Sequence, residues 1–388
     1  MPRHRTVNVA QPDATRRTPR PRAPGDQLGG RVLLEVREIL EIDDAHTAWH
    51  PDGFAWRAHR LAQRFRLEGP VTIDGRPTWW VGVETDCLRG VDPASERVWA
   101  WIAAQNAAHR LGALVLEGDR VRHRARVAVR EGALPARVRL LAEWATVANL
   151  YAHGLAQSLE EGLGARLASP ALALDVGDEP PGGDGDELRD ALVRVVVRGA
   201  DAVVPDRMRE LGGVSQVGLT HGAWVSSDLE AGRVRVRFAW GLQGLRETPF
   251  GGVVFREFAD GPPVVELFAE GGARHPLLGA GTLVTLAVPA PEGVSAAEGV
   301  RSANAWNLAE LGAPLAMSSL GAWSWRPAAA GLGDAWVWGA FFPDAAAYPL
   351  LPGLETKEAI ARAHWFVGGP GRGLRPGGEA GHEPKRAP

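Results

Sequence analysis

Residues 320–343 read LGAWSWRPAAAGLGDAWVWGAFFP and form the clearest structural pattern in the sequence. Segments 322–326 and 335–342 alternate small or polar residues with aromatic ones, a period typical of β-strands. The segment 327–334 is dominated by Ala and Gly, so we expect a loose connection between two paired strands. Pairing of these strands would gather four indoles on one face of the hairpin: Trp323, Trp325, Trp336 and Trp338.

A weaker copy of this hairpin occurs earlier in the chain. Residues 111–130 begin with the same Leu-Gly-Ala and also place an Asp before the second strand. In both halves the helix that precedes the hairpin carries an Asn shortly before a terminal Leu-Gly, at Asn106 and Asn307. We therefore expect one unit of strands, helix, hairpin and helix to occur twice.

Periodicity and turn residues predict the remaining elements. In the first half we expect a helix at 31–42, strands at 54–67 and 78–85, a helix from Asp92-Pro93 to about 111, the hairpin, and a long helix from Pro135. In the second half we expect a helix at 188–198, a meander of strands at 233–241, 252–259 and 264–270, a strand at 281–289, a helix opened by the capping box of Ser295 and Glu298, the tryptophan hairpin, and a closing helix at 354–366.

The fold class is therefore predicted as α+β, with two tandem modules that each pack an antiparallel sheet against helices. Residues 1–28 are rich in Arg and Pro and almost free of large apolar residues, which predicts a disordered basic arm. Module 1 covers 29–168 and module 2 covers 188–368. The acidic Gly/Pro segment 169–187 is predicted to link them, and 369–388 to form a disordered tail.

Composition limits the functional class. The net charge of −3 does not favour general binding of nucleic acid. A single cysteine excludes an internal disulfide framework and suits the cytoplasm. No uninterrupted apolar run approaches the ~20 residues of a membrane span, so we expect no membrane partner.

We find no motif that predicts a reaction. Nothing in the spacing places a general base beside Cys87, and the pair His46 and His50 lacks the Glu of a zinc hydrolase motif. The glycine clusters lack the context of a dinucleotide or phosphate loop. We therefore expect no catalytic residues, no metal and no cofactor, and we interpret the protein as a non-enzyme.

Two surface patterns leave alternatives open. Arg120, Arg122, Arg124 and Arg126 alternate with apolar or neutral residues, so their guanidinium groups should line one sheet face, and 233–237 repeat the pattern. That face is either a solvated side opposite a core or a basic surface for an acidic polypeptide or nucleic acid. Likewise, the tryptophan hairpin either packs in the core or forms an aromatic groove for a peptide.

The repeated unit resembles the type III secretion chaperone-like superfamily, which includes sensory-transduction-regulator-like proteins. The resemblance covers roughly 31–165 and 188–368. It rests on the strands before Thr85, the helix through Asn106, the hairpin at 113–130 and their counterparts around Asn307 and Leu320-Gly-Ala-Trp323. It implies an α+β fold that binds an extended segment of a partner protein without catalysis.

The sequence thus predicts a peptide- or protein-binding protein with a chaperone-like role. The expected partner-binding residues are Trp323, Trp325, Trp336, Trp338, Arg122, Arg124 and Arg126. The alternative function is binding of nucleic acid or another anionic partner through the Arg-lined faces, with strong salt dependence as its signature.

Overall fold

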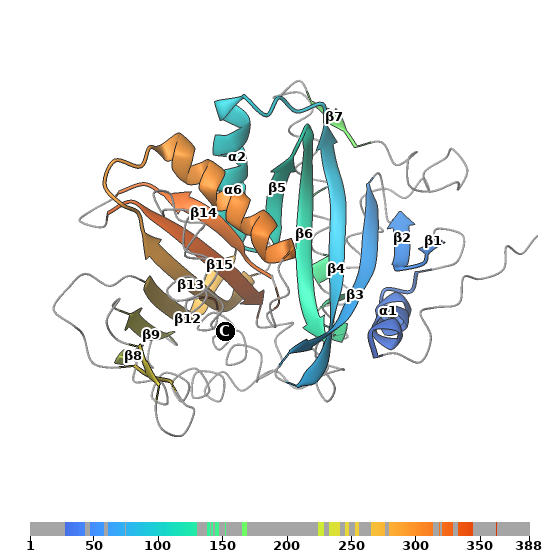
Figure 1. Cartoon of the computed structure of the whole chain (residues 1–388), viewed down its shortest axis with the longest axis horizontal. Coiled ribbons are helices and arrows are strands. Elements are labelled where there is room, and N and C mark those ends of the chain that lie inside the picture. The colour runs from blue at the N-terminus through green and yellow to red at the C-terminus, as the bar shows by residue number, and fades with distance from the viewer. Residues whose placement is uncertain are drawn as a thin grey trace, which may run out of the picture.

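The protein, described by a computed structural model, has an α+β fold in which helices lie between and beside antiparallel sheets (Figure 1). The structure describes residues 28–42, 47–57, 61–73, 75–129, 138–139, 141–142, 144–146, 152, 165–168, 224–228, 233–240, 245–247, 253–255, 265–275, 279–312, 318, 320–328, 333–343 and 362. The predictions for the basic arm, the linker, the helix at 188–198 and the C-terminal tail lie outside these residues. So do those for the closing helix, apart from Arg362, and for most of the helix from Pro135.

The first sheet contains the early hairpin and has the order β1-β2-β3-β4-β6-β5, with β7 paired to the far end of β4. Its strands are β1 (Thr47–His50), β2 (Gly53–Arg57), β3 (Ala62–Ile73), β4 (Arg76–Arg89), β5 (Ala113–Glu117), β6 (Arg120–Val129) and β7 (Arg166–Leu167). The single strand expected at 54–67 is instead two antiparallel strands, β2 and β3. Residues 58–60 contain no Gly, Pro, Asn or Asp, so no turn residue in the sequence marks where the chain reverses.

The second sheet has the order β14-β15-β13-β12-β9-β8. Its strands are β8 (Trp224–Asp228), β9 (Arg233–Trp240), β12 (Val265–His275), β13 (Gly279–Pro289), β14 (Ala322–Arg326) and β15 (Ala335–Pro343). The tryptophan hairpin is confirmed as β14 and β15, which place Trp323 opposite Trp338 and Trp325 opposite Trp336.

The expected meander is wrong in its middle strand. The strand β9 pairs directly with β12, while β11 (Val253–Phe255) pairs with β10 (Leu245–Glu247) in a separate small sheet. Because the chain between β9 and β12 forms its own hairpin, the two longer strands become neighbours.

Three helices are described over most of their length: α1 (Leu28–Ile39), α2 (Glu96–His109) and α6 (Ala296–Gly312). The side chain of Asp92 accepts a hydrogen bond from Ala94 N at 2.9 Å, so it closes a turn, and the helix begins only after Ser95. At α6 the serine half of the predicted capping box is present, because Glu298 N donates to Ser295 Oγ at 3.2 Å.

The apolar core extends through both halves of the chain. One continuous cluster of buried residues combines Val36 of α1 and Val83 of β4 with Leu286 of β13 and Trp306 of α6. In the same cluster, the rings of Trp144 and Phe342 meet at 6.5 Å between centroids. Since helix α2 also packs beside α6 (Figure 1), the two halves of the chain are joined by packing as well as by sequence.

Asparagine side chains satisfy the backbone at the edges of both sheets. Asn106 of α2 accepts from Leu114 N and donates to Leu114 O on edge strand β5, both at 2.9 Å. Asn307 of α6 makes the same pair of bonds with Trp323 on edge strand β14, at 2.7 and 3.1 Å. These amides occupy the place of a neighbouring strand, so the repeated asparagine of the two halves has one structural role.

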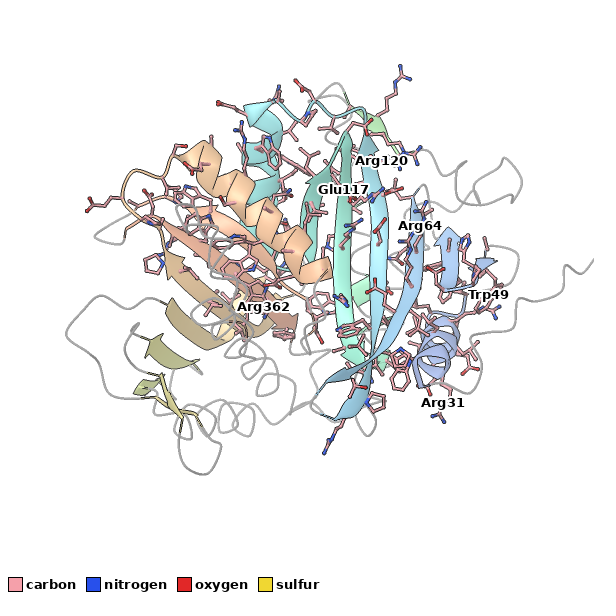
Figure 2. The ribbon with its side chains drawn as sticks, viewed as in Figure 1. Arg31, Trp49, Arg64, Glu117, Arg120 and Arg362 are labelled. Atoms are coloured by element: carbon pink, nitrogen blue, oxygen red, sulfur yellow. The ribbon has the colours of Figure 1, made fainter. Side chains whose placement is uncertain are left out.

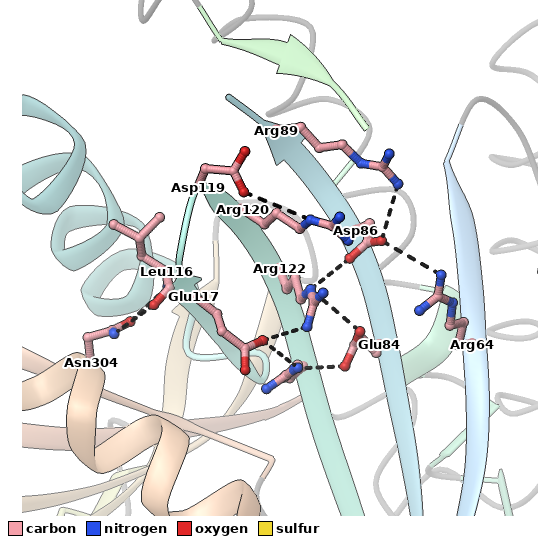
Figure 3. A network of polar contacts seen from close by, with 11 residues as sticks. Arg64, Glu84, Asp86, Arg89, Leu116, Glu117, Asp119, Arg120, Arg122 and Asn304 are labelled. Carbon is pink, nitrogen blue, oxygen red and sulfur yellow. Dashed lines mark hydrogen bonds and ion pairs between the residues drawn. The ribbon is translucent and has the colours of Figure 1, made fainter. Parts of the chain in front are cut away.

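A third asparagine connects the two halves. Asn304 of α6 accepts from Leu116 N at 2.9 Å and donates to Leu116 O at 3.1 Å, so a helix of the second half caps the edge strand of the first (Figure 3). Nearby, Gly112 N donates to Leu320 O at 2.7 Å, and Phe341 N donates to Arg110 O at 3.1 Å. Backbone groups from one half are thus satisfied by the other.

Truncation of the buried indoles tests the core assignment of the hairpin. We expect Trp323→Ala and Trp336→Ala each to lower the free energy of unfolding by about 3–5 kcal/mol, because each leaves a large cavity. Chemical denaturation measures this, with the half-buried Trp101→Ala as the control that loses less. Near-parent stability of both variants would contradict the assignment.

Removal of Asn304 tests the connection between the halves. Asn304→Ala leaves the buried Leu116 N–H and C=O without this partner, which should cost about 2–4 kcal/mol of stability. Arg301→Ala, an exposed change on the same helix, is the control and should stay within about 0.5 kcal/mol of the parent. Equal stability of the two variants would show that the amide contributes nothing.

Candidate functional site

The four predicted partner-binding tryptophans are brought together, but in the interior. Their exposed fractions are 0% for Trp323, 8% for Trp325 and 1% each for Trp336 and Trp338. A fifth indole, Trp306 of α6, lies among them, 5.0 Å from the ring of Trp323 and 4.8 Å from that of Trp336. Sequence reasoning did not single out Trp306, although its place on a helix before the hairpin was visible. The cluster presents almost no surface to a partner, so these residues have a structural role here.

A buried ion pair adds polar order to this cluster. Glu310 accepts hydrogen bonds from Trp323 Nε1 and from Arg362 Nε, both at 2.7 Å. Arg362, only 1% exposed, also lies 3.9 Å above the ring of Trp338, in the second half of the chain (Figure 2). The buried charge of Arg362 needs the Glu310 carboxylate and the Trp338 ring to offset the cost of its desolvation. These side chains must therefore keep fixed positions in the cluster.

The arginines of β6 lie on one sheet face, as the alternation predicts, but carboxylates of neighbouring strands pair with them. Arg122 Nε lies 2.8 Å from Asp86 Oδ1, and Arg124 Nε lies 2.8 Å from Glu84 Oε2 (Figure 3). Glu117 of β5 contacts both guanidinium groups. The face therefore carries a ladder of ion pairs rather than a strip of uncompensated positive charge.

Arg126 differs from its neighbours because it is buried at the contact with α6. Its guanidinium donates to the carbonyl oxygens of Glu310, at 3.4 Å, and Leu311, at 2.9 Å, near the negative end of the α6 dipole. It also pairs with Glu68 at 3.1 Å and stacks over Trp80 at 4.4 Å. Desolvation lowers the pKa of Arg126, and the Glu68 carboxylate partly offsets this. This arginine anchors the C-terminal end of α6 to the first sheet.

The ion-pair face has a hollow beside the end of α6. A cavity of about 140 Å³ lies over Gly82 in the middle of β4, with Leu311 at its rim. In the part of the chain that the structure describes, α6 is the only helix that packs on this face of β5 and β6, while α1 packs on the opposite, apolar face. We call the face formed by Arg64, Arg66, Gly82, Glu84, Arg124 and Arg126 the charged face. It is the candidate functional site.

Sequence reasoning missed Gly82. The sequence did contain an indication of this site, because Gly82 lies inside a predicted strand. A glycine in such a position often marks the close approach of a ligand or of another backbone.

The buried Cys87 and His123 lie beneath the sheet rather than in a cavity. Burial raises the pKa of Cys87 to about 12, an effect that Asp86 and Glu84 reinforce, so the thiol stays protonated at neutral pH. Burial lowers the pKa of His123 to about 4, and its Nε2 lies 2.6 Å from Leu111 O. Neither side chain is available as a nucleophile or base.

A second cavity, of about 270 Å³, is lined by His50 and Asp52 at the turn between β1 and β2 and by Arg64 of β3. Within the described residues, no three His, Cys, Asp or Glu side chains gather in a way that could hold a metal ion. None of the helices in that same part of the chain is long and apolar enough to cross a membrane.

Comparisons with protein-family models, with curated proteins and with solved structures find no match to this chain. The resemblance to the type III secretion chaperone-like superfamily therefore stays a proposal, and function is argued from the charged face.

The two buried histidines predict a pH-dependent stability. Burial lowers the pKa of His123, and likewise of His275, from 6.5 to about 4, so the unfolded chain binds protons more readily in this range. Stability should therefore be complete above about pH 6.5 and decline as the pH falls towards about 4, by on the order of 3 kcal/mol for His123.

Melting temperatures between about pH 8 and about pH 4 measure this decline. His123→Gln should remove the part of the decline that His123 causes and leave that of His275, and the exposed His50→Gln should leave the decline unchanged. An identical decline in His123→Gln and the parent would contradict the assignment.

Proposed function

We propose that the protein is a non-catalytic, chaperone-like binding protein that holds an extended segment of a partner polypeptide against its charged face. One observation supports this proposal most directly: the polar face of the sheet has a cavity over Gly82, a glycine in the middle of β4. The other side chains of these strands are packed. The charged face lies on the long neighbouring strands β3, β4 and β6. It is therefore long enough to hold an extended peptide segment.

The edges formed by β5 and β14 support the face, rather than strand addition at these two strands, as the mode of binding. At β5 the outward backbone groups of Leu114 and Leu116 are already bonded to Asn106 and Asn304. At β14, Trp323 is bonded to Asn307 in the same way. A partner strand would have to displace these buried amides, so we place the partner on the charged face.

The ion pairs favour a polypeptide over nucleic acid. Phosphate binding depends on cationic side chains that release counterions, whereas Arg122 is held by three carboxylate groups and Arg124 by two. A polypeptide carries both signs of charge and can exchange individual pairs. The two halves, each with a hairpin, an asparagine-bearing helix and a capped edge, also support our proposal of two tandem modules of the chaperone-like type.

Binding to an array of short unstructured peptides of varied composition tests this function. We expect the protein to retain a subset of the peptides at physiological salt, and we expect a single-stranded oligonucleotide not to bind under the same conditions. The parent chain is compared with Arg64→Glu, which reverses one charge on the face. Salt-sensitive binding of the oligonucleotide without any peptide binding would favour the nucleic-acid alternative and overturn the proposal.

A further inference from the structure

The charged face has a regular arrangement around Gly82. In the sheet register Gly82 lies between Arg66 of β3 and Arg126 of β6. The neighbouring rows place Arg64, Glu84 and Arg124 on one side and Glu68, Trp80 and Ala128 on the other. Residues paired in this way share one face, so eight side chains surround a position that has none.

The position over Gly82 is empty space within the described structure. A methyl group at Gly82 would meet no heavy atom within 4 Å, and the backbone there is ordinary strand that any residue can adopt. Glycine in the interior of a strand weakens the strand. Since the local backbone geometry does not require glycine at position 82, its presence there has another cause. The cavity at this place offers one.

The charges at this cavity are unequal in sign and in strength of pairing. Three arginines and two glutamates line it, and Asp52, the carboxylate nearest to Arg66, lies outside the lining. Arg124 and Arg126 are held by carboxylates at 2.8–3.1 Å. Among the residues that the structure describes, Arg66 pairs with Asp52 alone, at 4.0 Å, and both side chains are about half exposed. Such a surface pair contributes little, so Arg66 can exchange its partner at small cost.

We propose that the hollow over Gly82 is a specific subsite for an acidic side chain of the bound polypeptide, whose carboxylate pairs with Arg66 while its backbone passes over the glycine. This inference rests on the proposed function and adds the chemistry of its ligand. Arg66 supplies a planar donor group that fits a carboxylate in a bidentate manner. Leu311 at the rim contacts the aliphatic part of the same side chain.

The test uses two fluorescein-labelled peptides, one of alternating Thr and Glu and one with Gln in place of every Glu. Fluorescence anisotropy with the full chain at physiological salt should show binding of the Glu peptide about tenfold tighter than the Gln peptide, since a charge-assisted hydrogen bond is lost in the latter. Free succinate at the same carboxylate concentration should not compete. Equal competition by succinate would show a site for a small acid and overturn the polypeptide source.

Two variants locate the site. Gly82→Leu fills the hollow, and Arg66→Gln removes its charge while keeping a polar side chain. Each should reduce the preference for Glu over Gln to about twofold or less. The matched controls are Gly333→Leu, at another glycine with open space around it, and the exposed Arg97→Gln, and both should retain the preference.

The outcomes separate this inference from the proposed function. Equal binding of both peptides to the parent, or an unchanged preference in Arg66→Gln, overturns the acidic subsite and leaves peptide binding intact. Failure of the parent to bind any peptide, on the array or in solution, overturns the proposed function itself. Because the side chain of Arg66 is exposed, we expect Arg66→Gln to fold. This variant therefore still tests the subsite even if Gly82→Leu does not fold.

Discussion

The structure depends on how two sheet edges are closed in the middle of the molecule. Strands β5 and β14 each present backbone groups that no other described strand pairs, and buried groups of this kind are costly unless they are bonded. Asn106, Asn304 and Asn307 supply the missing bonds from the two helices that lie between the sheets. The positions of α2 and α6 follow from this requirement, and so does the continuous core beneath them.

The same constraint places two alternating sheet faces in different surroundings. The aromatic face of β14 and β15 is covered by α6, so its indoles become core, and Glu310 and Arg362 order them. Among the described elements, α6 covers the arginine face of β6 where the helix ends, at Arg126, and the face remains polar elsewhere. Function is therefore best sought where the helix stops, beside Gly82.

Local patterns predicted the elements well and the contacts between them poorly. Alternation located the tryptophan hairpin, and the arginines of β6 lie on one face as expected. Register was not predictable, and register alone places Glu84 and Asp86 beside these arginines. Asn304 gave no signal, because its partner Leu116 is 188 residues away in the sequence. The chain reversal between β2 and β3 was missed because residues 58–60 contain none of the usual turn residues.

The bond between Asn304 and Leu116 also bears on synthesis of the chain. The first half emerges from the ribosome with the Leu116 position of its edge strand still uncapped, and the capping helix follows 188 residues later. At about 5–20 residues per second this interval lasts roughly 10–40 s, during which the strand can pair with other chains. The N-terminal half is thus most prone to aggregation while the protein is being made, and completion of α6 ends that exposure.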